Sequence, residues 1–239
     1  MAIPKVQTLK VYDGPSLIKQ AVRIIVLLTG FAVRSKNTKT GGMIQSYILR
    51  YDIAPHLAVK SGADEAVCGN CKLRPAIFVK DEVSPRKCYV NTWQGARSTW
   101  VANRDRAVEY DLALEHLEGR KLRKGTYGDP GAVPAHIWEG LESAATGDTG
   151  YTHRWKDVGA NLQAVCMASV HGADETRLAW KRGFRTFRVL QPGESMLKGE
   201  ISCPASKEAG ALTTCEQCGL CNGAQGSDDR RKSIVILAH

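Results

Sequence analysis

Short runs of apolar and β-branched residues recur along the chain, and most of them end at a polar or glycine-rich turn that precedes a helical pattern. In the second half this pattern predicts strands at residues 121–127, 150–155, 165–170, 185–190, 200–203 and 233–238. It predicts helices at 135–145, from 158 onward and at 173–182. The first half is less regular, with expected strands at 24–28, 47–50, 76–80 and 87–91 and a helix over about 101–119.

Alternation of strands and helices predicts an α/β fold, because parallel strands are joined by helical crossovers. We expect a reduced or irregular (β/α) barrel, with an open doubly wound sheet as the alternative, and functional groups in the loops that follow the strands. No repeat, low-complexity tract or linker divides the chain, so residues 1–239 are expected to form a single domain.

Composition indicates an ordinary globular protein, with 43% hydrophobic and 24% charged residues. The longest apolar stretch, residues 17–33, contains Lys19 and Arg23 and is too short for a membrane-spanning helix, and the N-terminus lacks the pattern of a secretory signal. We therefore expect a cytoplasmic protein without a membrane partner. The sequence does not indicate an oligomeric state.

A formal net charge of +9 indicates an acidic partner such as nucleic acid. The candidate phosphate-contacting residues lie in the loop 34–39 and near the C-terminus, and they are Arg34, Lys36, Lys39, Arg230 and Arg231. The alternative is a solvated surface with an incidental excess of charge.

Four of the eight cysteines lie in a segment near the C-terminus, residues 203–221. Cys215, Cys218 and Cys221 are spaced by three residues, which allows a tight loop to direct three thiolates at one ion. Cys203 or His239 is the candidate fourth ligand. We expect a zinc-binding insertion, and an iron–sulfur cluster is the alternative.

A second group consists of Cys68 and Cys71 in "CGNC", followed by Cys88. Three cysteines without an obvious fourth ligand leave two interpretations open, a second metal site or a grouping in sequence alone. A redox use of "CGNC" is a third, although the flanking pattern lacks the expected order of strand and helix.

Polar groups at the ends of predicted strands are the candidates for chemistry. Asp129 follows a strand that ends at Tyr127, and it serves either as a catalytic carboxylate or as the cap of the next helix. His153 is a candidate acid–base group or a structural histidine. Asn91 and Gln94 could hydrogen-bond a nucleobase beside the ring of Trp93.

A strand that ends at Cys203 in "CPASKEAG", followed by the three-cysteine loop and a late histidine, resembles the end of the tRNA-guanine transglycosylase barrel, and the segments "TYGDPGAVP", "GYTHRW" and "FRTFRV" carry the resemblance to a subgroup of this family. The similarity is greatest to compact phage-encoded relatives that insert 7-deazaguanine bases into DNA. The family carries an aspartate nucleophile just before the strand-end cysteine, where this chain has Ser202, with Glu200 two positions earlier. We therefore place the nucleophile at Asp129, on local sequence alone.

This resemblance implies a DNA guanine transglycosylase, a pentosyltransferase that exchanges guanine for a preQ0-type base through a covalent carboxylate intermediate. The candidate catalytic residues are Asp129, Glu200 and His153, and the candidate substrate-binding residues are Asn91, Trp93, Gln94, Tyr127 and Ser202. It implies a structural zinc ion, DNA and a 7-deazaguanine as partners, and the host cytoplasm as location. The alternatives are a noncatalytic zinc-containing DNA-binding protein and an iron–sulfur or redox enzyme.

Overall fold

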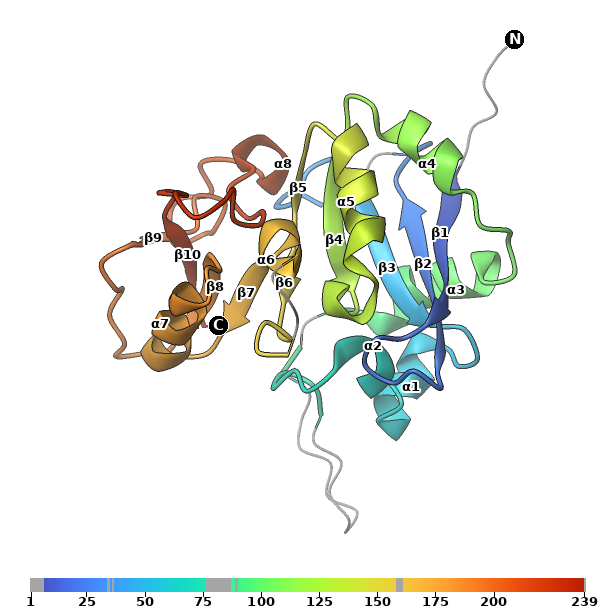
Figure 1. Cartoon of the computed structure of the whole chain (residues 1–239), viewed down its shortest axis with the longest axis horizontal. Helices are drawn as coiled ribbons and strands as arrows, with labels where there is room; N and C mark the ends of the chain where they lie inside the picture. Colours follow the sequence, from blue (N-terminus) through green and yellow to red (C-terminus); the bar gives the residue numbers. More distant parts are fainter. Residues whose placement is uncertain are drawn as a thin grey trace.

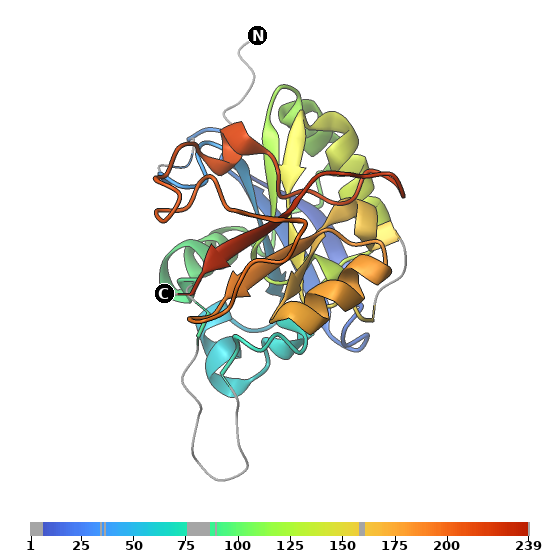
Figure 2. The ribbon, with the colours of Figure 1, turned by 90° about the vertical axis from the view of Figure 1, so that its left-hand side faces the viewer.

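The computed structural model describes residues 7–33, 35, 37–75, 87–88, 90–157 and 161–238, without the side chain of Asn161. Two five-stranded sheets form its centre. In Figure 1 the first sheet, blue to yellow-green, lies beside the second, which is yellow to red. Figure 2 views the molecule from the side of the second sheet, with strand β10 in front.

The first sheet has the order β1-β2-β3-β4-β5. Its strands are β1 (Thr8–Pro15), β2 (Arg23–Thr29), β3 (Ile44–Arg50), β4 (Lys121–Tyr127) and β5 (Gly147–Thr149). β1, β2 and β3 pair antiparallel, whereas β4 runs parallel to both β3 and β5. Residues 24–28 of β2 are all buried, as expected for an apolar strand in the middle of a sheet.

Helices pack around the first sheet and on the connections between its strands. They are α1 (Pro55–Ser61), α2 (Glu65–Cys68), α3 (Arg97–Asn103), α4 (Tyr110–Leu117), α5 (Ala135–Ala144) and α6 (Asn161–Val165), with a π-helical turn at Thr92–Ala96 and a 3₁₀ turn at Pro130–Ala132. On α5 the spacing of the buried residues Trp138 and Leu141 places both on the face that joins the core.

The second sheet is parallel throughout, in the order β6-β7-β8-β10-β9. Its strands are β6 (Tyr151–Thr152), β7 (Met167–Val170), β8 (Thr186–Leu190), β9 (Glu200–Ser202) and β10 (Ser233–Leu237). Helix α7 (Ala173–Lys181) contacts β7 and β8, and α8 (Cys215–Cys218) lies in the cysteine-rich segment.

Gly150 alone separates β5 from β6, so the chain passes directly from the first sheet into the second. The strand pairings of the described residues give two sheets, and no closed barrel is found among them. The α/β class and its parallel pairing are confirmed, while the barrel remains a prediction.

Most strand predictions in the second half are confirmed to within a few residues, and β4 coincides with the prediction. The strand predicted at 150–155 extends only over Tyr151–Thr152 in the second sheet. The first strand, β1, was not predicted.

Two predictions in the first half are wrong. The helix expected over 101–119 is two helices, α3 and α4, because Val108 bridges to Lys10 and the Glu109 amide donates to the Lys10 carbonyl at 2.8 Å. In the strand expected at 87–91, the described residues are not extended into a sheet, since Lys87 and Cys88 both donate to the Leu73 carbonyl. The strand expected at 76–80 lies outside the described residues.

Among the described residues, no helix combines the length and apolar character required to span a membrane.

Candidate functional site at the carboxyl ends of β4, β6 and β7

Three polar residues follow successive parallel strands of the two sheets. Asp129 lies two residues after β4, His153 follows β6 directly, and His171 follows β7 directly. The carboxyl ends of these strands lie on the same edge, because β5 and β6 continue one another and all the pairings involved are parallel. We call this group, together with Ser169, the strand-end cluster.

Asp129 is buried, and its carboxylate accepts three hydrogen bonds. Oδ1 accepts from the Gly131 amide at 2.8 Å and from Thr152 Oγ1 at 2.7 Å, while Oδ2 accepts from the His153 amide at 2.7 Å. The first bond caps the 3₁₀ turn, and the other two join the end of β4 to the end of β6. In this structure Asp129 therefore has the capping role that the sequence left open as an alternative to catalysis.

The ring of His153 lies between Asp129 and Ser169. Its Nδ1 is 4.0 Å from Asp129 Oδ2, and its Nε2 is 3.1 Å from Ser169 Oγ. Burial lowers the pKa of His153, although Asp129 and Glu175 oppose that shift. A neutral ring next to a hydroxyl group can accept a proton from it, so the arrangement suits a general base.

His171 extends this cluster, with its ring 5.7 Å from that of His153. Burial, and then the neighbouring His153, lower the pKa of His171. Glu175, on α7, accepts a hydrogen bond from the His171 amide at 2.8 Å and pairs with Lys72 and Lys156 at 3.1 and 3.0 Å. Glu175 therefore holds the start of α7 against the strand-end cluster.

The loop that carries Cys68 and Cys71 lies next to Asp129. The Asp129 amide donates to the Val67 carbonyl at 2.7 Å, directly before Cys68. Cys88 comes to the same loop, because its amide donates to the Leu73 carbonyl at 2.9 Å. The backbone of all three cysteines of the first group is thus brought to one loop, although Cys88 is distant from Cys68 and Cys71 in sequence.

The segment from Cys215 to Cys221 lies near the amino ends of β3, β4 and β6, whereas Cys203 directly follows β9. The Cys215 amide donates to the Lys39 carbonyl at 2.8 Å, Lys121 Nζ donates to the Glu216 carbonyl at 2.6 Å, and the Gly150 amide donates to the Cys221 carbonyl at 2.9 Å. This segment therefore connects the second sheet to the first.

Cys203, Cys215 and Cys221 belong to one apolar cluster on the second sheet. Burial raises the pKa of Cys221 to about 12, with Tyr151 opposing and with Cys203, Cys215 and Cys218 adding to the increase. The four thiols are therefore close enough to repel one another when ionised. Within the described parts of the chain, no three His, Cys, Asp or Glu side chains already have the arrangement of a metal site.

Burial raises the pKa of Cys215, and the cationic side chains of Arg123 on β4 and of Lys39 oppose that increase. Such cations would offset the negative charge of a metal bound by thiolates. His239, the alternative fourth ligand, lies outside the described residues.

The other predicted site residues are separate from the strand-end cluster. Glu200 is buried on β9, where its oxygens accept from Arg188 at 2.9 and 2.7 Å and from the Leu197 amide at 2.7 Å. Ser202 is exposed, with Oγ 3.8 Å from Met196 Sδ. Tyr127 is buried at the end of β4.

The predicted base-contacting residues lie at the π-helical turn. The side-chain Oδ1 of Asn91 caps this turn by accepting from the amides of Trp93 and Gln94 at 2.9 and 3.2 Å. Gln94 is exposed. The Trp93 ring is 64% exposed and lies 4.1 Å from the His56 ring, so one side of the indole remains accessible for stacking.

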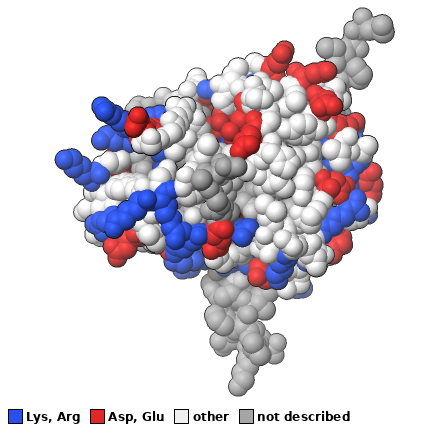
Figure 3. Space-filling view, in the orientation of Figure 1, with Lys and Arg blue, Asp and Glu red and all other residues white. Residues whose placement is uncertain are grey.

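The predicted phosphate-contacting residues are scattered. Arg34 and Lys36 lie outside the described residues, Lys39 and Arg230 are exposed, and Arg231 is engaged by Asp229. In Figure 3, Lys and Arg gather over the part of the molecule that carries α7, and Asp and Glu over the part that carries α4 and α5. The positive charge is therefore concentrated on one part of this surface, but the charge alone does not identify a ligand.

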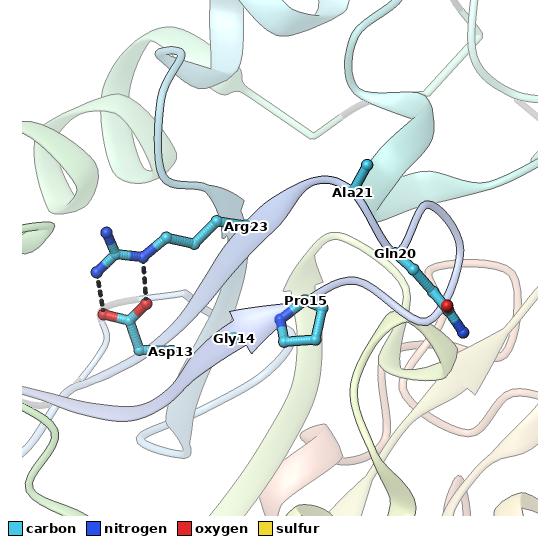
Figure 4. Close-up of a pocket in the computed structure, with 6 residues that line it drawn as sticks. All are labelled: Asp13, Gly14, Pro15, Gln20, Ala21 and Arg23. Atoms are coloured by element: carbon cyan, nitrogen blue, oxygen red, sulfur yellow. Dashed lines mark hydrogen bonds and ion pairs between the residues drawn. The ribbon is translucent and has the colours of Figure 1, made fainter.

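An open cavity of about 450 Å³ lies at the β1–β2 hairpin. It is lined by Asp13, Gly14, Pro15, Gln20, Ala21 and Arg23. Figure 4 shows that Arg23 lies against Asp13, with hydrogen bonds of 2.7 and 3.0 Å. The carboxylate of Asp13 is engaged by this pairing, and the lining offers no histidine for proton transfer, so the cavity is a weaker candidate than the strand-end cluster.

Ser169, His171 and Glu175 were not identified from the sequence. The detectable signal for His171 was its position directly after a predicted strand, the same criterion that selected Asp129 and His153. Ser169 carries no such signal, because it lies within β7 and its role depends on a contact across the sheet.

No protein-family model, curated protein or solved structure matches this chain.

Proposed function

We propose that this protein is an enzyme that modifies nucleic acid, with its reaction site at the strand-end cluster and with DNA guanine exchange as its reaction. The observation that carries the proposal is the contact of His153 with Ser169 on one side and with Asp129 on the other. Strand carboxyl ends are where α/β proteins place reactive groups, and the net charge of +9 favours an anionic polymer as substrate.

In this reaction a carboxylate attacks C1′ of a deoxyguanosine while the C1′–N9 bond breaks, and the departing guanine takes up a proton. The incoming 7-deazaguanine then loses its N9 proton and displaces the carboxylate. We assign both proton transfers to His153. The ring takes a proton from solvent and donates it to the departing guanine, and the neutral ring, which its lowered pKa favours, then accepts the N9 proton of the incoming base.

Asp129 remains our proposed nucleophile, provided that its carboxylate can reach the sugar. Its side chain is only 4% exposed, so attack on a sugar needs the carboxylate to release one of its three present donors. Glu200 is less suited to this role, because the buried Arg188 occupies both of its oxygens.

The four C-terminal cysteines are our proposed site for a structural zinc ion. Cys203, Cys215, Cys218 and Cys221 would supply the thiolates, and their apolar surroundings fit a closed site that excludes water. The ion would fix the segment that connects the two sheets.

The test is incorporation of labelled guanine or a labelled 7-deazaguanine into DNA by the purified protein. We expect His153→Gln to lower the incorporation rate about 100-fold or more and Asp129→Asn to abolish the covalent protein–DNA adduct. His136→Gln, on the exposed face of α5, is the matched control and should leave the rate unchanged.

Two results would contradict the proposal. If wild-type protein binds DNA but incorporates none of several bases, the noncatalytic DNA-binding alternative is favoured. If His153→Gln incorporates base at the wild-type rate, the reaction site lies elsewhere.

A further inference from the structure

The first group of cysteines combines two segments of the chain at the edge that carries the strand-end cluster. Cys68 ends α2, and Cys71 follows in a turn in which its amide donates to the Cys68 carbonyl at 3.4 Å. The backbone of Cys88 is held against this turn through the Leu73 carbonyl. Three thiols are therefore placed around one loop although the proposed base exchange uses none of them.

The loop is anchored by a buried ion pair. Arg74 forms two hydrogen bonds with the Asp64 carboxylate, at 2.9 and 2.7 Å, and it also donates to the carbonyls of Gly69 and Gly62 at 2.6 and 3.0 Å. Asp64 is 1% exposed. Since one side chain fixes the loop at both ends, the positions of Cys68 and Cys71 are determined before any ligand binds.

Backbone hydrogen bonds fix the turn at Cys71. The Arg74 amide donates to the Cys71 carbonyl at 3.1 Å, beside the bond from the Cys71 amide to the Cys68 carbonyl. Cys68 and Cys71 are therefore held in one tight turn, and cysteines bind metals as thiolates.

The three thiols also lie close to one another and to a carboxylate. Burial raises the pKa of Cys68, and the nearby Asp64, Cys71, Cys88 and Asp129 add to the increase. Arg74 already balances Asp64, so a cation near the sulfur atoms is needed only for several of the thiols to be ionised together.

We propose that Cys68, Cys71 and Cys88 together bind one thiophilic metal centre, either a zinc ion or an iron–sulfur cluster, beside the strand-end cluster. Three protein ligands leave the fourth position of a tetrahedral centre to a ligand from outside the protein, as in catalytic rather than structural sites. The site is distinct from the four C-terminal cysteines, which belong to other segments of the chain: Cys203 follows β9, and Cys215 and Cys221 bond to the backbone before β3 and β6. The proposal goes beyond the proposed function, since it requires only the geometry of the three cysteines.

The arrangement requires rotation of the side chains on binding. Among the described residues, no three candidate ligands already surround a common point. The backbone contacts that gather Cys68, Cys71 and Cys88 are in place, so rotation about the side-chain bonds of three short residues is the change needed.

The test measures metal content per chain in protein purified anaerobically, together with its visible absorption. We expect wild-type protein to hold one metal centre more than Cys71→Ser or Cys88→Ser. Cys218→Ser should lose the other centre and keep this one. Cys166→Ala, which changes a buried thiol in the core, is the control and should lose neither.

Absorption separates the two forms of the centre. Broad visible absorption that disappears in Cys71→Ser identifies an iron–sulfur cluster. A colourless protein that gains thiolate-to-metal bands on exchange with cobalt(II), reduced in the same variant, identifies zinc.

Two outcomes would overturn the proposal. One is unchanged metal content in Cys68→Ser, Cys71→Ser and Cys88→Ser. The other is a disulfide between Cys68 and Cys71 in protein kept under anaerobic conditions. Thermal melting of each variant shows whether it is folded, and because metal content is read without DNA, a failure of base exchange does not affect the result.

Discussion

The chemical role of the His153 imidazole depends on its contacts with two residues that are distant in sequence. Asp129 comes from the end of β4, and Ser169 comes from the middle of β7. A lone histidine after a strand is compatible with a structural or a catalytic role, and only the 3.1 Å contact to Ser169 favours the second. For Asp129 the structure favours the structural role, because this residue, selected from the sequence as a catalytic candidate, caps the 3₁₀ turn that follows it.

Glu175 is the residue for which the structure makes a pH-dependent prediction. Burial alone would raise its pKa, but the His171 amide, Lys156 and Lys72 outweigh burial and lower it from 4.5 to about 2. A carboxylate with a lowered pKa stabilises the fold above its unfolded pKa, and that contribution is lost as the pH falls through the folded value. Glu175→Gln should therefore reduce the free energy of unfolding by about 2 kcal/mol at pH 7.

Denaturant unfolding of wild type and variant measures this difference. We expect the gap between them to narrow as the pH falls from 4.5 toward about 2. Asp174→Asn is the control, because that side chain is fully exposed and its pairing with Arg177 lies in solvent. A gap that is independent of pH would refute the assigned charge interactions.

At the scale of the elements, local pattern was sufficient where an element is continuous and flanked by turn residues. β4 was predicted to the residue because its strand pattern ends at the turn sequence "GDPG". The helical pattern of residues 101–119 contains no comparable break signal, and its interruption is decided by pairing of Val108 and Glu109 with β1. A helix break that a tertiary contact causes cannot be predicted from the local sequence.

Arg188 and Glu200 connect β8 with β9, and both side chains are buried. Removing one partner leaves an uncompensated buried charge, so Glu200→Gln should lower the free energy of unfolding by about 3 kcal/mol. The double variant Arg188→Met/Glu200→Leu should lose less than the sum of the two single variants. Chemical unfolding of the four proteins in this cycle provides the measurement.

This cycle also separates structure from catalysis. If Glu200 acts structurally, variants that are folded at the assay temperature keep their activity. Full stability with loss of activity in Glu200→Gln would instead restore Glu200 as a catalytic candidate.

At the scale of the whole molecule, the passage between the two sheets occurs at one residue. A Cβ on Gly150 would lie 2.9 Å from Lys124 Cε and 3.0 Å from Cys166 Sγ, both buried side chains. The Gly150 amide and carbonyl bond to Cys221 and Met167, so the backbone cannot shift without disturbing the cysteine segment or β7.

Gly150→Ala should therefore destabilise the protein by about 1–3 kcal/mol through overpacking. Thermal melting measures the effect, and we expect a lower midpoint with an unchanged secondary-structure signal at low temperature. A midpoint equal to that of wild type would mean that the two sheets can separate enough to accept a methyl group at their junction.

The sequence by itself determined the α/β class, the positions of most strands in the second half, and the choice of Asp129 and His153 as strand-end residues. These features depend on hydrophobic periodicity and on turn residues, and both can be read from positions that are close together in the sequence. Only the tertiary structure decided that the strands divide into two sheets at Gly150, that Ser169 and His171 join His153, and that Cys88 returns to Cys68 and Cys71. Such groupings depend on contacts between distant segments, whose burial and hydrogen bonding no local pattern specifies.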